Sequence, residues 1–473
     1  MWCLRVLDLT TKLSLIFLSL SSISGLAGLA HSAVAGDADH TIESAEGSAV
    51  EASGERSSSG SEDLELIPRA ADNEDDGVKK IRYTPEFFSQ YNPVNAGDMV
   101  NQVPGFRLDS GGDRRGFGGV AGNALINGAR PTTKDDDVGE ILKRIPASQV
   151  DYIDLVRGET GGLNLRGQSV VVNIMLKDDS AIAVQWEGEL ERDMDDGVMR
   201  PGGTLSFTGS IGSTQYSVGL EAIEKISGEQ SVERLLTGPA RVAVEDRFES
   251  KEKEERDIEG SFNIESKLSD TIIHVNGRIQ SGESSDLTES RREPVNADRD
   301  RRRFVRGSRD DSLSIELGGD IRFPITEALT GKGIALFNYS DSDASSFREI
   351  FDAGSRIETV SRAPKSTQKT ESIVRLEFDW KRFSAHHLEV NLEGAVNTLE
   401  NSLTLLEGDG DEQSETKLPG ANTKVEEVRG DFEISDTWTI GDFVVDSALA
   451  AEISTITQSG DGANERSFFF MKP

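Results

Sequence analysis

The chain has 473 residues, of which 84 are acidic and 51 are basic, and its formal net charge is -33. This balance argues against nucleic-acid binding, because proteins of that class carry basic clusters that neutralise phosphates. The length allows two or more domains, and the only cysteine, Cys3, has no partner for a disulfide bond within the chain.

The first 35 residues have the pattern of a secretory signal peptide. Arg5 and Lys12 precede an apolar run over 13–29, and small residues at 33–35 form a cleavage site that ends at Ala35. A membrane-anchoring helix is the alternative, but serine and glycine interrupt the apolar run. We therefore expect residues 1–35 to direct export.

Residues 36–77 are predicted to form a disordered acidic linker. They consist mainly of Ser, Gly, Ala, Glu and Asp, with too few large apolar side chains to bury a core. One short island, 62–67, mixes apolar and acidic residues.

Residues 78–178 change to short β-like runs, turns and one or two helical stretches. The nearly unbroken apolar run at 170–176 predicts a strand that is buried on both faces. A helical piece is expected within 142–150, ending at Pro146, and a solvated acidic loop at 134–137 should precede a helix.

The glycine-rich stretch 114–128 matches a dinucleotide-binding fingerprint only loosely. That fingerprint requires a strand before it and a helix after it, whereas here polar residues precede Gly116 and the Asn127-Gly128 turn follows. No cofactor is expected, and the absence of hydrolase, metalloprotease and kinase signatures makes an enzyme an unfavoured reading. His386 and His387 should point to opposite faces of a strand, so a shared metal site is not expected.

Residues 179–473 are predicted to be part of a β-barrel. Apolar and polar side chains alternate with a period of two in many segments, including 182–190, 313–323, 374–380, 388–396 and 428–434. In a membrane the apolar stripes would face lipid, and the carboxylate-rich stripes would line a polar, wet interior.

The predicted connections alternate between short and long. Tight turns are expected near 212–213, 268–270, 383–385 and 436–439, and long polar segments at 223–255, 281–311, 341–370 and 400–423. Short periplasmic turns and long outer loops are typical of outer-membrane barrels. Eleven full strands can be counted and a twelfth begins at 467–470, so we expect a truncated barrel or one that needs a partner segment to close.

Residues 78–178 resemble the plug domain of TonB-dependent outer-membrane receptors. The motifs of that family occur in one ordered series: Pro104-Gly105, Arg115-Gly116 with Gly118, the Asn127-Gly128 turn, an I-P-x-x-x-V-x-x-I-x-x-x-R-G unit ending in Arg157-Gly158, and Asn173 in a V-N-I strand. The resemblance implies an N-terminal α+β plug followed by a transmembrane β-barrel of the 22-stranded family, here truncated. The glycines would allow the sharp turns of a compact plug.

The resemblance also implies active uptake of a scarce nutrient across the bacterial outer membrane. The partners would be the TonB–ExbB–ExbD complex, outer-membrane lipid and a small-molecule or oligosaccharide ligand, namely a siderophore, haem, cobalamin or a carbohydrate. The candidate for the TonB box, which pairs with TonB as an added strand, is Leu64, Glu65, Leu66 and Ile67.

Three points stay open at the level of the sequence. Arg114 and Arg115 either pair with the carboxylate-lined barrel wall or are solvated surface charges. The chain could bind a partner at the cell surface without transport, or be a non-functional truncated receptor. A soluble exported β-protein is a third alternative.

Overall fold

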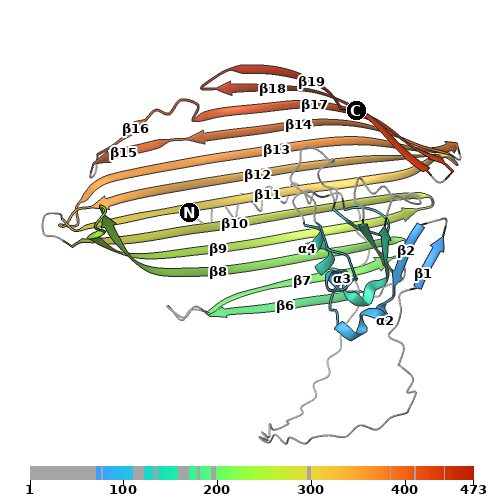
Figure 1. Ribbon diagram of the computed structural model, residues 1–473, viewed down its shortest axis with the longest axis horizontal. Coiled ribbons are helices and arrows are strands. Elements are labelled where there is room, and N and C mark those ends of the chain that lie inside the picture. The colour runs from blue at the N-terminus through green and yellow to red at the C-terminus, as the bar shows by residue number, and fades with distance from the viewer. Residues whose placement is uncertain are drawn as a thin grey trace, which may run out of the picture. The chain divides into compact units, whose positions relative to one another are not determined.

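The structure is a computed structural model of the chain (Figure 1). It describes residues 71–75, 78–109, 122–131, 133, 137–157, 170–177, 182–192, 199–295, 300–383, 385–409, 412–441 and 443–472. All of these belong to one compact unit, Glu65–Pro473. They form a small α+β domain within 71–177, termed the plug domain, and one large antiparallel sheet within 183–472, termed the large sheet.

The plug domain is built on a five-stranded sheet with the strand order β1-β2-β4-β5-β3, in which only β3 runs parallel to its neighbour. Its strands are β1 (Ala71–Asp75), β2 (Val78–Tyr83), β3 (Ala124–Ile126), β4 (Val150–Arg157) and β5 (Val170–Leu176). Its helices are α2 (Pro85–Phe88), α3 (Ala96–Asn101) and α4 (Val138–Lys143), with 3-10 turns η1 (Ser89–Tyr91) and η3 (Ala147–Gln149). No helix in the described part of the chain is long and apolar enough to cross a membrane.

The plug domain has its own hydrophobic core. Helix α3 begins with a capping box, in which the side chains of Asn95 and Asp98 each accept a backbone N–H of the other residue. Its buried Met99 and Val100 pack into one cluster with residues of α4, β4 and β5. The predicted strand at 170–176 is confirmed as β5, and 171–174 are buried consecutively.

Two predictions for this region differ from the structure. The helical piece expected within 142–150 is divided: α4 begins earlier, with the Asp137 side chain accepting the Gly139 N–H, and ends at Lys143. Pro146 then separates it from η3, because proline cannot donate the backbone bond that would continue a helix. Regular structure also extends into the expected linker, since β1 pairs with β2.

A buried carboxylate joins β2 to β4. The side chain of Asp154 is 1% exposed, lies 2.6 Å from Lys80 Nζ and accepts two hydrogen bonds from Arg82, at 2.8 and 3.1 Å. The bond to Asp154 raises the pKa of Arg82. Both cations are only partly buried and keep contact with solvent, whereas the buried carboxylate of Asp154 depends on the ion pairs to compensate its charge.

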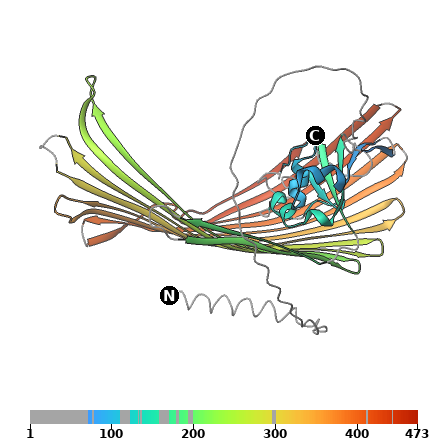
Figure 2. The same cartoon turned by 90° about the horizontal axis from the view of Figure 1, so that it is seen from below.

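The large sheet has 14 strands, and one continuous path runs through β6 to β14 and then β17, β18 and β19. The bounds are β6 (Ala183–Arg192), β7 (Met199–Ile211), β8 (Thr214–Thr237), β9 (Val242–Leu268), β10 (Thr271–Pro294), β11 (Arg302–Thr326), β12 (Leu329–Phe351), β13 (Ile357–Phe383), β14 (His386–Leu403), β15 (Leu405–Asp409), β16 (Glu412–Thr416), β17 (Asn422–Ile440), β18 (Phe443–Gly460) and β19 (Asn464–Lys472). The short β15–β16 hairpin lies beside β13. Figure 2 shows the twist that accumulates across these strands. The predicted twelfth strand is confirmed as β19, which begins before the expected position.

Short and long connections alternate as predicted. Only two residues separate β7 from β8, β9 from β10, β11 from β12, β13 from β14 and β17 from β18, and these strand ends define one edge, termed the short-turn end. The connections at 238–241, 295–301, 352–356, 404–421 and 461–463 define the long-turn end. Gly212, Ser269 and Gly441 have φ values of 59°, 56° and 58°, the left-handed conformation that tight hairpin turns require.

The long polar segments predicted at 223–255, 281–311 and 341–370 are mostly strand, so the prediction of loops is wrong. Strands β8 to β13 have 23–27 residues, whereas about 9–11 cross a bilayer. Cross-strand ion pairs occupy the extensions: Arg234 Nε lies 2.6 Å from Asp246 and Arg256 Nη2 lies 2.9 Å from Glu224. The turn predicted at 436–439 is also displaced, because β17 continues to Ile440.

On the large sheet many apolar side chains are exposed and the neighbouring polar side chains are buried, the reverse of the usual arrangement in a protein in water. On β17, Val428 is 58% exposed, while the neighbouring Glu427 and Arg429 are 8% and 6% exposed. On β11, Leu317 is 49% exposed and Glu316 is 2% exposed. The predicted alternation is therefore confirmed, and we term the exposed apolar side the outer face and the polar side the inner face.

The inner face is not uniformly polar. Ile334, Leu336, Ile373 and Ala395 form a buried apolar cluster on β12, β13 and β14. Ile334 is directly opposite the inner-facing Arg375. The inner face predicted to be polar and rich in carboxylates thus includes an apolar cluster, because alternation assigns side chains to a face without showing what covers that face.

Replacing Asp154 by asparagine is expected to destabilise the plug sheet by about 3 kcal/mol, because it breaks a buried charge pair while leaving both cations in place. Hydrogen exchange of the full chain in detergent should accelerate in β2 and β4. The control is Asp151→Asn, at an exposed position of β4. Equal exchange in the two variants would contradict the role given to Asp154.

Replacing Leu376, which is 44% exposed on the outer face, by arginine should cost about 2–4 kcal/mol in lipid vesicles, because a cation is placed in hydrocarbon. Leu376→Met should cost less than about 1.5 kcal/mol, since it conserves apolar volume. Denaturant titration of the protein in vesicles measures both. Equal stability of the two variants would show that this face does not contact lipid.

Candidate functional site

Some of the plug motifs predicted from the sequence lie together in the structure. Pro104 and Gly105 form a turn in which the Phe106 N–H donates to the Val103 carbonyl, at 3.2 Å. Gly105 has φ of 72°, and a Cβ atom there would lie 2.8 Å from the guanidinium of Arg157. Glycine suits this left-handed conformation, whereas the flexible end of the Arg157 side chain could shift to admit a Cβ atom. Arg114, Arg115, Gly116, Gly118, Gly158, the TonB-box candidate and Ala35 lie outside the described residues.

The Asn127-Gly128 turn is fixed from within the plug domain. Asn127 has φ of 51° and Gly128 has φ of 81°. The Asn127 Oδ1 atom accepts the Leu176 N–H at 3.0 Å, and the Gly128 N–H donates to Asn173 Oδ1 at 2.8 Å. The structure thus brings three predicted motif residues into one hydrogen-bonded turn.

The same turn contacts the wall of the large sheet. Asn127 Nδ2 donates to Gln215 Oε1 at 2.9 Å and to Glu265 Oε2 at 2.8 Å. Gln215 and Glu265 belong to β8 and β9, and the two are in direct register close to the short-turn end. A single plug side chain therefore bridges two strands of the wall.

Further contacts link α4 and η3 of the plug to the wall. Gln149 Nε2 donates to the Thr208 carbonyl, and the Thr208 hydroxyl donates to the Arg144 carbonyl, both at 3.1 Å. Arg144 Nη1 lies 3.6 Å from Glu259. Sequence reasoning missed these residues, because their partners lie on strands that only the tertiary fold brings near.

The wall beneath the Asn127 turn carries a buried charge network. Glu265 Oε2 lies 3.5 Å from His274 Nε2, and His274 Nδ1 lies 3.2 Å from Asp320. Lys332 Nζ lies 3.4 Å from the same carboxylate of Asp320. Thr133 of the plug is hydrogen-bonded to Glu316 on the adjoining part of β11. The part of the wall that the plug contacts therefore alternates acidic with basic side chains.

Two cavities separate the plug from the wall. One of about 60 Å³ is lined by plug residues including Ile126 and Ile145 and by wall residues including Tyr216 and His274. A second, of about 240 Å³, has Lys143 and Arg144 opposite Glu187, Glu221 and Glu259. The polar contacts between plug and wall are thus interrupted by open space.

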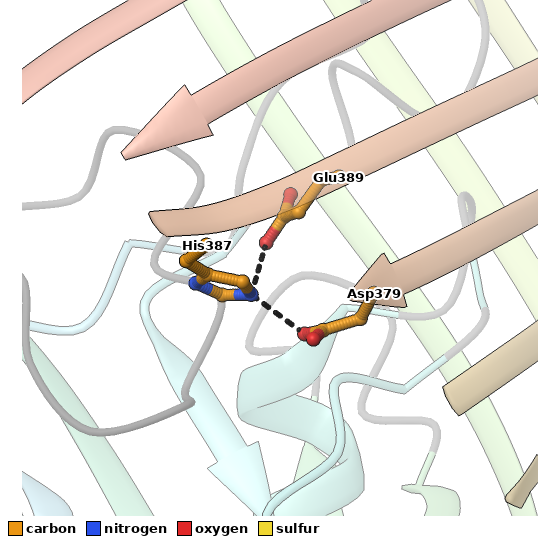
Figure 3. A group of neighbouring side chains, drawn as sticks. All are labelled: Asp379, His387 and Glu389. Carbon is orange, nitrogen blue, oxygen red and sulfur yellow. Dashed lines mark ion pairs between the residues drawn. The ribbon is translucent and has the colours of Figure 1, made fainter. Parts of the chain in front are cut away.

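Asp379, His387 and Glu389 form a group with metal-binding chemistry on the inner face (Figure 3). Asp379 and Glu389 are directly opposite in the β13–β14 register, and His387 Nε2 lies 2.9 Å from Asp379 and 3.7 Å from Glu389. Imidazole and carboxylate are ligands that zinc accepts, but here the imidazole bridges the two acids, and Lys381 Nζ is 3.9 Å from Asp379. The group is best described as an ion-pair cluster.

The prediction that the adjacent histidines face apart is confirmed. His386 Nδ1 lies 2.8 Å from Asp436, and its ring stacks on Trp438 with centroids 5.2 Å apart, while His387 faces Asp379. The alternation of His387 and Glu389 along β14 was the available sequence signal for the cluster. Asp379 could not be found this way, since it comes from another strand.

Replacing Asn127 by aspartate should loosen the contact between plug and wall, because a carboxylate would face Glu265 without a donor between them. The lost bond to a charged acceptor is worth about 2 kcal/mol, or roughly a thirtyfold faster hydrogen exchange in β3 and β5. Asn92→Asp is the control, at an exposed residue with φ of 48°. Unchanged exchange in Asn127→Asp would contradict the contact.

No family model and no curated protein matches the chain. Among solved structures, the chain is similar to the ferric yersiniabactin uptake receptor FyuA from Yersinia pestis, with 11% identity, 80% of this chain and 72% of that chain covered, and a TM-score of 0.26. The RagAB peptide importer has 12% identity, with 83% of this chain and 56% of that chain covered and a TM-score of 0.36. The alcaligin outer-membrane receptor FauA from Bordetella pertussis has 10% identity, with 86% of this chain and 96% of that chain covered and a TM-score of 0.20.

These scores are too low to carry a functional argument, so the fold is assigned from the architecture of the chain itself. A small α+β domain with the ordered plug motifs precedes a long antiparallel meander and contacts its polar face through Asn127, Gln149 and Arg144. This architecture is an α+β domain in contact with one face of a large antiparallel sheet.

Proposed function

We propose that the chain is a TonB-dependent receptor of the bacterial outer membrane that takes up a scarce nutrient. The observation that carries the proposal is the exposed apolar face of the large sheet, opposite a polar face that the plug contacts. An apolar surface of this extent is unfavourable in water, whereas hydrocarbon removes the cost and requires the backbone to be paired within the sheet.

The positions of the tryptophans support an orientation in the membrane. Trp186, Trp380 and Trp438 are 75%, 37% and 43% exposed on the outer face. Trp380 lies within four residues of the end of β13, and Trp438 lies within four residues of the end of β17, both at the short-turn end. Aromatic girdles mark the boundary between lipid and water in outer-membrane barrels, and their short turns are periplasmic. The short-turn end is therefore proposed to face the periplasm.

This orientation places the contacts between plug and wall near the periplasmic side, where an inner-membrane protein could reach the chain. TonB, powered by ExbB and ExbD, is proposed to pair as an added strand with Leu64, Glu65, Leu66 and Ile67. Such pairing relies on backbone hydrogen bonds. The ligand is proposed to be a small molecule or oligosaccharide such as a siderophore, haem, cobalamin or a carbohydrate, with no enzymatic step and no cofactor.

Uptake should depend on TonB. The experiment compares, by mass spectrometry of the medium, three strains: one with the chain, one without it, and one with the chain but without TonB. At least one compound should be depleted only by the first strain. Depletion that persists without TonB, or recovery of the protein as a dissolved periplasmic monomer, would overturn the proposal.

Leu66→Pro should abolish binding of the periplasmic domain of TonB, because proline has no N–H to donate to the strand that TonB adds. Leu66→Ala should bind within about threefold of the natural chain, since the backbone donors are unchanged. Pull-down of the full-length protein in detergent measures both. Equal binding of the two variants would place the TonB box elsewhere.

A further inference from the structure

Three arginines, Arg247, Arg292 and Arg302, form one row across β9, β10 and β11 near the long-turn end. Arg292 is directly opposite Arg247 on one side and Arg302 on the other in the strand registers. Like charges placed directly opposite across strands destabilise a sheet. The row is therefore not explained by folding stability, and it is notable in a chain with a net charge of -33.

The row lies on the inner face. Residues two apart on a strand share a face, and Arg292 shares one with Ser290 and Thr288, which are 4% and 7% exposed, and further along with Asn276 and His274. Arg292 is also among the last three residues of the 24-residue β10, far beyond the length that crosses a bilayer. A solute entering from the long-turn end would meet these side chains before reaching the plug.

The charges of the row are only partly compensated. Arg247 Nε lies 2.7 Å from Glu245, and Arg302 Nη2 lies 3.5 Å from Glu358. Arg292 has no ion pair among the described residues, and its guanidinium lies 3.6 Å above the ring of Phe304. Its Nε atom is buried without a hydrogen-bond partner in the described part of the chain.

The surroundings of Arg292 disfavour its charge. Burial lowers its pKa, as do Arg247 and Arg302, against the opposing effect of Glu245 and Glu249. An unsatisfied buried donor of this kind costs free energy, and an anion would supply the missing acceptor. Stacking on Phe304 holds the planar fork of N–H donors in place, and that fork matches a carboxylate or phosphate.

We propose that Arg247, Arg292 and Arg302 bind a soluble ligand that carries several carboxylate or phosphate groups. A ligand with several anionic groups can contact Arg292, which has no ion pair among the described residues, and its neighbours Arg247 and Arg302 at the same time. This site names a substrate class for the receptor and rests on the proposed function for its biological meaning. Its binding chemistry can be measured without TonB.

The test is calorimetric titration of the full-length protein in detergent with citrate and, separately, with inorganic phosphate. Citrate should bind, with an affinity that falls as salt rises. Arg292→Gln should weaken binding at least tenfold. Arg291→Gln is the matched control, because Arg291 lies on the opposite face over the ring of Phe248, and it should change affinity less than about twofold.

A stability measurement separates loss of the site from misfolding. Arg292→Gln removes like-charge repulsion, so its melting temperature should equal or exceed that of the natural chain. If this variant does not fold, Arg302→Gln, at a side chain that is 53% exposed, should show the same loss of citrate binding. Binding of neither citrate nor phosphate by the natural chain would overturn the proposal, as would equal losses in Arg291→Gln and Arg292→Gln.

Vesicles containing phosphatidylglycerol distinguish a lipid headgroup from a soluble ligand. Vesicle binding by the full-length protein that is lost in Arg292→Gln, without binding of citrate or phosphate, would overturn the proposal. If citrate binds as expected but no compound is taken up in a TonB-dependent way, the proposed function fails and the anion site stands. If uptake depends on TonB but Arg292→Gln binds citrate normally, the site fails and the function stands.

Discussion

Backbone pairing across an exposed apolar sheet is the constraint on which the rest of the structure depends. In hydrocarbon no water can satisfy a free N–H or C=O group, and β6 to β14 followed by β17, β18 and β19 pair consecutively along one path. Because side chains alternate, this arrangement sends every second residue to the opposite face, where Glu316, Asp320 and Glu427 are nearly buried. The charges of the inner face then need partners, and the plug, His274 and the inner-face arginines provide them.

The strands were predictable wherever one face of the strand is apolar and the other is polar. Segments such as 374–380 therefore gave both the strand and its orientation, and the apolar run at 170–176 gave β5 with its bounds. The strand extensions toward the long-turn end were not predictable in this way. Both faces of 249–256 are polar, so hydrophobic periodicity is absent, and the pairing is visible only through cross-strand contacts such as Arg256 with Glu224.

The candidate sites show a similar division. The Asn127-Gly128 turn was recognisable because asparagine and glycine tolerate the left-handed conformation, and Asn173 was recognisable from its motif. Their partners were not, since Gln215 and Glu265 are separated from Asn127 by 88 and 138 residues. The arginine row needed the register as well: the sequence shows Arg292 and Arg302 near one turn, but Arg247 joins them only through the β9–β10 pairing.

The arrangement of the plug sheet determines how it would respond to a pull from the N-terminal side. Its order β1-β2-β4-β5-β3 places the first two strands at one edge, so tension would separate β1 from β2 and then β2 from β4, one pair of hydrogen bonds at a time. The carboxylate of Asp154 resists the second step, because separating the strands would remove both Lys80 and Arg82 from it. Beyond that point lie the apolar core around Ile153 and Leu155 and the polar contacts of Asn127. An apolar core resists water entry, whereas the hydrogen bonds between the plug and the polar wall can be replaced by hydrogen bonds to water at small net cost. Release of the plug from the wall should therefore precede unfolding of its core.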